Sequence, residues 1–134
     1  MTDKRPLWVL VIACALLFVF GGKGGAIFTP PPIDAEGLHV LIIEETADRN
    51  NLPVSQAAVL QSIQLRSYVQ EKNGNYRQLD DDSNMELAAQ KWKDAMLLPR
   101  DSLPWLIVSN KGGYTGPLPE TLEETMAILK KWGE

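Results

Sequence analysis

The stretch "SLPWLIVSNKGGYTGPLP", residues 102–119, decides the fold of this chain. Its run at 105–108 is apolar and partly β-branched, which is typical of a strand. A second short strand is expected near Tyr114, and the glycine pair at 112–113 permits the positive φ of a hairpin turn. Pro104 stands directly before the first strand, where a proline is tolerated because no ladder needs its N–H. The stretch predicts a β-hairpin entered through a proline loop.

Residues 38–45, "LHVLIIEE", form a continuous apolar run, which is typical of a strand covered on both faces. Pro53 suits the first turn of a helix, and helical propensity continues to about residue 72. This helix is expected to touch more than one neighbour, because its apolar residues fall on two faces. The larger face comprises Val54, Ala57, Ala58, Leu65, Tyr68 and Val69, and the smaller one Val59, Leu60 and Ile63.

Three further elements complete the pattern. Residues 76–82, "YRQLDDD", are predicted as a strand that follows a turn signal. Ser83 is expected to cap a helix over residues 84–97, with Glu86 completing a capping box. The last helix, about 119–132, has acidic residues near its start and lysines near its end, as the helix dipole favours. The buried side of the middle helix is expected to comprise Leu87, Ala88, Trp92, Ala95 and Met96.

The expected element order is β-α-β-α-β-β-α, within the α/β class. Because helices join the first three strands, these strands are expected to be parallel, and the closing hairpin adds an antiparallel edge. The prediction is a mixed four-stranded sheet with helices on both faces.

This order, with a proline directly before the third strand, resembles the thioredoxin fold over residues 38–132. In thioredoxin-like proteins a cis-proline precedes the first strand of the hairpin, and glycines follow in the turn and in the second strand. Pro104 matches the cis-proline, the pair at 112–113 matches the turn, and Gly116 matches the later glycine.

The redox site of that family is missing here. Its chemistry needs a CxxC motif at the mouth of the first helix, where the helix dipole lowers the pKa of a thiol. The corresponding residues are "NNLP", 50–53, and the single cysteine, Cys14, lies in the N-terminal apolar run. Without a sulfur atom there, the domain is not expected to catalyse thiol–disulfide exchange.

The resemblance nevertheless implies a groove beside the Pro104 loop, which in the family pairs with extended polypeptide. We therefore expect a protein- or peptide-binding module rather than an enzyme, with no catalytic residue, no cofactor and no metal assigned. The expected binding residues are Asn50, Asn51, Leu52, Pro53, Leu103, Pro104 and Trp105.

An alternative hypothesis rests on carboxylates at two strand ends. Glu44 and Glu45 end the first strand and residues 80–82 end the second, so an enzyme of another class would use them as acid/base groups or as oxygen ligands of a hard cation. Solvated strand ends explain the same pattern. His39 has no nucleophile motif beside it and is expected to be structural. A third hypothesis is a structural subunit of a membrane complex.

The N-terminal residues predict a membrane segment. Lys4 and Arg5 precede an apolar run at 7–20, and two glycines extend the uncharged stretch to residue 22. This shape is typical of an uncleaved signal anchor or a signal peptide, and lipidation of Cys14 is a further hypothesis. The basic flank predicts a single-pass protein with its C-terminal domain on the extracytoplasmic side, or a secreted or periplasmic protein if the signal is cleaved.

Three segments are therefore expected: a signal anchor or signal peptide at 1–23, a Gly/Pro-rich linker at 24–37 and a thioredoxin-like domain at 38–134. From Glu36 onward, 10 Lys and Arg stand against 15 Asp and Glu. Because nucleic-acid binding needs a basic surface, no nucleic-acid partner is expected.

Overall fold

A computed structural model of the chain describes residues 30–134, so the signal and anchor predictions lie outside the described residues. None of the helices within 30–134 has the length and apolar character that a membrane span needs. The elements are β1 (His39–Glu44), the 3-10 helix η3 (Thr46–Asn51), α2 (Val54–Leu60), α3 (Ile63–Glu71), β2 (Asn75–Asp80), α4 (Gln90–Met96), β3 (Trp105–Ser109), β4 (Gly113–Pro117) and α5 (Leu122–Gly133).

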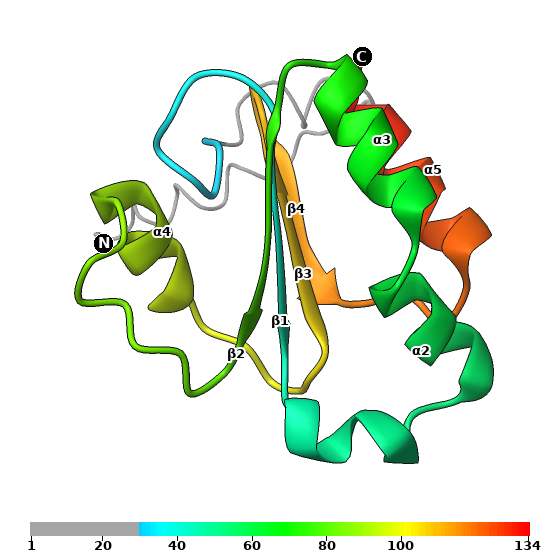
Figure 1. Ribbon diagram of the computed structural model, residues 1–134. Coiled ribbons are helices and arrows are strands. Elements are labelled where there is room, and N and C mark those ends of the chain that lie inside the picture. The colour runs from blue at the N-terminus through cyan, green and yellow to red at the C-terminus, as the bar shows by residue number, and fades with distance from the viewer. Residues whose placement is uncertain (1–29) are drawn as a thin grey trace, which may run out of the picture. The chain divides into compact units, whose positions relative to one another are not determined.

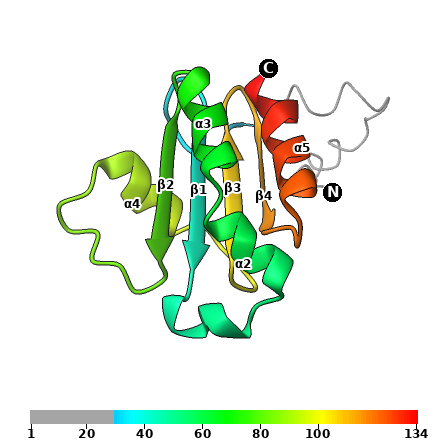
Figure 2. The same cartoon turned by 45° about the vertical axis from the view of Figure 1, so that its right-hand side comes forward.

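The four strands form one mixed sheet in the order β2-β1-β3-β4, which confirms the predicted α/β class (Figure 1). One apolar cluster joins α2, α3 and α5 to one sheet face, and a second joins α4 to the other face (Figure 1 and Figure 2). All six residues of β1 are buried because both of its faces are covered.

The predicted parallel pairing of the third strand is wrong, because β3 runs antiparallel to β1. β2 ends at Asp80, which pairs with Glu44 at the end of β1. β3 begins at Trp105, which pairs with Ile43 at that same end. The intervening chain runs back along the sheet and returns through α4 (Figure 2), so it enters β3 where it left β2. A parallel strand would have to start at the opposite end.

The single helix predicted over residues 53–72 is two helices, α2 and α3. The Ser62 hydroxyl accepts from the N–H groups of Gln64 and Leu65, at 3.1 and 3.4 Å, and caps the second helix. This break lets both helices bury residues against one sheet face. The buried apolar residues are Val59, Leu60, Leu65 and Val69, whereas Val54 and Ile63, assigned to apolar faces, are exposed.

The predicted start of the middle helix is also wrong, because α4 begins only at Gln90. The Asn84 side-chain oxygen accepts from the Glu86 N–H at 2.9 Å, so a local turn replaces the expected capping box. Leu87, expected in the core, is 99% exposed. Within α4 the prediction is confirmed, since Trp92, Ala95 and Met96 are buried.

The residues just before β1 pack onto the sheet. Ile33 is 1% exposed, and its backbone exchanges two hydrogen bonds with the Ser109 hydroxyl, at 3.0 and 3.1 Å. The folded unit therefore begins at about Pro31, inside the segment expected as a linker.

In the turn between β3 and β4, glycine is required at position 113 by close approach, because a Cβ would lie 2.2 Å from the Val108 carbonyl oxygen. The positive φ expected at 112–113 is not found.

Candidate functional site

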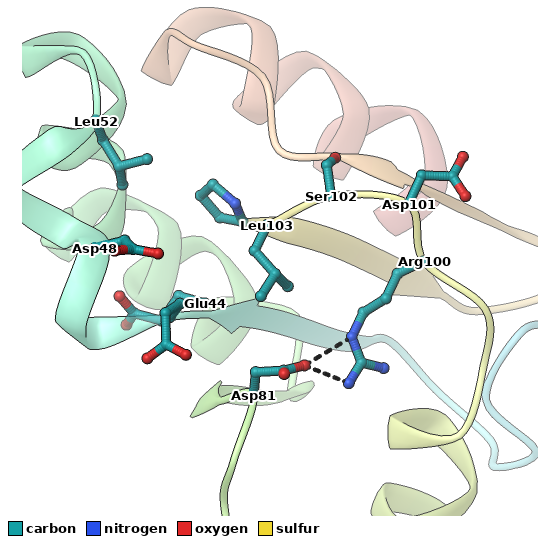
Figure 3. A pocket seen from close by; sticks show the side chains of 10 residues that line it. Glu44, Asp48, Leu52, Asp81, Arg100, Asp101, Ser102 and Leu103 are labelled. Atoms are coloured by element: carbon teal, nitrogen blue, oxygen red, sulfur yellow. Dashed lines mark hydrogen bonds and ion pairs between the residues drawn. The ribbon is translucent and has the colours of Figure 1, made fainter.

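A cleft of about 500 Å³ lies at the sheet end where β1 finishes and β3 begins (Figure 3). One wall comes from the end of β1, from η3 and from Leu52, which follows η3. The other wall is the loop at 100–104 together with Asp81. The Leu103–Pro104 peptide bond in this loop is cis, which confirms the assignment of Pro104 as a cis-proline.

The cleft brings together three of the seven predicted binding residues. These three are Leu52, Leu103 and Pro104. Asn50, Asn51 and Pro53 are exposed next to Leu52 in the chain but do not line the cleft.

Trp105 is held in the sheet core and does not line the cleft. Its side chain packs in the same apolar cluster as α4, and the residue is 7% exposed. The indole Nε1–H donates to the Thr115 hydroxyl at 3.0 Å, which satisfies its one polar group. The indole is therefore a packing residue beneath the loop and not a contact surface.

Glu44 provides a buried carboxylate at the floor of the cleft. It is 3% exposed, and Arg49 donates to both of its oxygens, from Nε to Oε1 at 3.0 Å and from Nη2 to Oε2 at 2.6 Å. The Gln78 amide donates to Oε2 at 2.8 Å. Hydrogen bonding to Glu44 raises the pKa of the Arg49 guanidinium. The charge of Glu44 is therefore compensated within the protein.

The Glu44 network continues along β2. The Tyr76 hydroxyl donates to the Gln78 side-chain oxygen at 3.0 Å, and burial raises the pKa of Tyr76 to about 12. Tyr76 therefore stays protonated at neutral pH and donates this hydrogen bond.

A second arginine fixes the opposite wall. Arg100 donates from Nε and Nη2 to Asp81 Oδ1, at 3.1 and 2.5 Å, and from Nη1 to the Met96 carbonyl oxygen at 2.8 Å. These contacts join the loop before β3 to the end of β2 and to the end of α4. No sequence motif pointed to Arg100, and its position just after a predicted helix was the available signal.

Three of the five strand-end carboxylates meet at one edge of the sheet. Oxygens of Glu45, Asp80 and Asp82 lie within 4.8 Å of one another. Asp80, however, accepts from the Thr46 hydroxyl and from the N–H groups of Thr46 and Asp82, both at 2.9 Å. These hydrogen bonds, that from the Thr46 hydroxyl above all, lower the pKa of Asp80.

Comparisons with known proteins give no relative. No protein-family model, no curated protein and no solved structure matches this chain. The function of the cleft is therefore inferred from its own chemistry.

His39 lies at the opposite end of β1 from the cleft and is 1% exposed. Its Nε2 is 2.9 Å from Lys91 Nζ and 3.3 Å from the Asn75 amide nitrogen, and its Nδ1 is 3.1 Å from the Gly37 carbonyl oxygen. Because Lys91 and Asn75 present donors, the arrangement fits a neutral ring with its proton on Nδ1. Burial lowers the pKa of His39. This environment fits a structural role.

Proposed function

We propose that this chain is a membrane-tethered, thioredoxin-like protein without redox cysteines, whose domain binds an extended segment of another protein. The observation that carries this proposal is the cleft between Leu52 and the Leu103–Pro104 loop. The domain would stand on the extracytoplasmic side, held by the apolar run at 7–20.

Three features support the thioredoxin-like assignment. The strand order is β2-β1-β3-β4, the helices cover both faces of the sheet, and the cis bond of Pro104 stands directly before β3. Fold alone does not define function, so the binding role rests on the cleft itself.

The cleft offers binding without covalent chemistry. Of residues 50–53, which stand where the family has its thiol pair, only Leu52 lines the cleft, and leucine has no reactive sulfur atom. Leu52 and Leu103 supply apolar surface on opposing walls, and the backbone of the loop runs along the sheet end (Figure 3). An extended segment would therefore lie between the walls and pair its backbone with the loop.

Photo-crosslinking in membranes of the native host tests this function. A benzophenone side chain placed at Leu52 is expected to give a discrete adduct, and the same group at Ile63, 76% exposed on α3, serves as the control. Ser102→Trp, which fills the exposed rim of the cleft, should abolish the adduct from Leu52. Equal adducts from both positions, unaffected by Ser102→Trp, would contradict the proposal.

A cation-dependent enzyme is the second candidate, favoured by the grouping of Glu45, Asp80 and Asp82. Thermal unfolding with added Ca²⁺ or Mg²⁺ tests it, since a ligand that binds the folded state raises Tm. A rise that disappears in Asp82→Asn would support a cation site. Asp82 is the suitable position because its side chain is exposed and its backbone N–H, which the substitution keeps, makes the turn.

A further inference from the structure

Resting on the proposed function, we infer that the bound segment carries a lysine or arginine side chain, which Glu45 and Asp48 recognise. Both residues line the wall of the cleft formed by β1 and η3. The cleft would then select its ligand by charge as well as by shape and backbone pairing.

The charges of the cleft divide into compensated and uncompensated groups. Glu44 is paired with Arg49 and Asp81 is paired with Arg100, so neither carboxylate needs an external cation. Glu45, Asp48 and Asp101 also line the cleft, and within residues 30–134 no basic side chain forms an ion pair with them. The cleft therefore presents uncompensated negative charge.

Among the described residues that line the cleft, no basic side chain is free to bind an acidic ligand. Arg100 is the only basic side chain among the described residues that line the cleft. Its guanidinium already donates to Asp81 and to the Met96 carbonyl oxygen, so an anionic ligand would have to displace an internal ion pair. Charge complementarity therefore favours a basic segment and disfavours an acidic one.

The walls also fit the shape of a long basic side chain. Leu52 and Asp48 line the same wall, and Leu103 stands on the facing wall (Figure 3). A lysine or arginine side chain would place its aliphatic stem between the two leucines and its charged end beside Asp48 and Glu45. A glutamine of similar length would keep the apolar contact and lose the charge.

Calorimetric titration of the full chain, kept in zwitterionic detergent, measures this selectivity. The probes are three capped peptides of sequence Ala-Val-Ala-X-Ala-Val-Ala, in which X is Lys, Gln or Glu. Ion pairs at partly exposed carboxylates are individually weak, so we expect the Lys peptide to bind about 10-fold more tightly than the Gln peptide. The Glu peptide should bind more weakly than both.

The double variant Glu45→Gln, Asp48→Asn should reduce Lys-peptide affinity to that of the Gln peptide. Glutamine at 45 keeps a side-chain oxygen to accept from the Ala47 N–H. The variant Glu71→Gln, Glu123→Gln changes the net charge equally at two exposed residues outside the cleft, and it should leave binding unchanged. Raising the salt to about 0.5 M should weaken only the Lys peptide, because screening shortens the reach of exposed charges.

Two other outcomes overturn the inference, and they differ in what they say of the proposed function. The three peptides could bind equally, with binding unchanged in the double variant but abolished by Ser102→Trp. This result would remove the charge requirement and leave the cleft as the binding site. If no peptide binds, both proposals fail. Stabilisation by Ca²⁺ that the double variant loses would then identify a cation site.

Discussion

Arg49 binds the buried carboxylate of Glu44 in a bidentate manner, with donor–acceptor distances of 3.0 and 2.6 Å. Arg49 belongs to η3 and Glu44 ends β1, so the pair fixes the position of η3 relative to the sheet. Because η3 forms one wall of the cleft, this internal pair shapes the candidate site without offering its charge to a ligand.

Arg49→Gln should destabilise the protein by about 2 kcal/mol, because it leaves a buried carboxylate without its cation. The double variant Arg49→Gln, Glu44→Gln should recover much of this loss, since no charge then remains buried. Denaturant unfolding measures both values. Lys111→Gln, at an exposed position in the β3–β4 turn, is the control and should have little effect. A double variant as unstable as the single one would contradict the role given to the pair.

Ile33→Ala should cost about 3 kcal/mol, the cost of emptying a buried isoleucine site. The side chain is 1% exposed and packs in the same cluster as α4. Ile63→Ala makes the same chemical change at a residue that is 76% exposed, and it should shift the unfolding free energy by about 0.5 kcal/mol or less. Equal effects at the two positions would mean that the segment before β1 is not part of the core.

Ser62→Ala should destabilise the protein by about 1 kcal/mol, because it removes the N-cap of α3. Ser83→Ala removes a serine that lies before a turn and not at a helix start, so its effect should be close to zero. Thermal unfolding of the two variants compares them directly. A larger loss of stability in Ser83→Ala than in Ser62→Ala would contradict this expectation and would indicate that Ser83 caps a helix.

The stability of the protein should decrease as the pH falls below about 6.5, the ordinary pKa of histidine. Burial, together with Lys91 2.9 Å away, lowers the pKa of His39, so the unfolded chain binds more protons than the folded chain just below this pH. The stability that the neutral His39 contributes is complete above pH 6.5 and is lost as the pH falls through the pKa of His39 in the folded state. His39→Gln should flatten the dependence between about pH 7.5 and pH 5.5. If the curves of stability against pH run parallel for the unchanged protein and for His39→Gln, His39 is not the group responsible.

The sequence predicted the elements whose determinants are local. The hairpin and the last helix each depend on neighbouring residues, and both are present. The cis form of Pro104 was implied by the resemblance to the thioredoxin fold, and it is also present. The two helix errors arise from local hydrogen bonds that compete with helix formation. Ser62 starts a new helix where propensity continued, and Asn84 closes a turn where a capping box was expected.

The direction of β3 and the charges of the cleft depend on tertiary structure. The length of the connection did not reveal that the chain between β2 and β3 runs back along the sheet and returns before Trp105 (Figure 2). This return makes β3 antiparallel to β1. The Arg100–Asp81 pair spans 19 residues, and no sequence spacing specifies it. The predicted carboxylate edge contained Glu44, Glu45 and Asp81 of the cleft but not Asp48 or Asp101. It also did not indicate which carboxylates an arginine neutralises.

The most direct test of the binding proposal is an NMR map of backbone amide shifts in the full chain as the Lys peptide is added. The proposal predicts that the largest shifts occur at Leu52, Ser102 and Leu103, and that they vanish in Ser102→Trp. Shifts concentrated instead at Met126 and its neighbours, in the groove between α3 and α5, would contradict it.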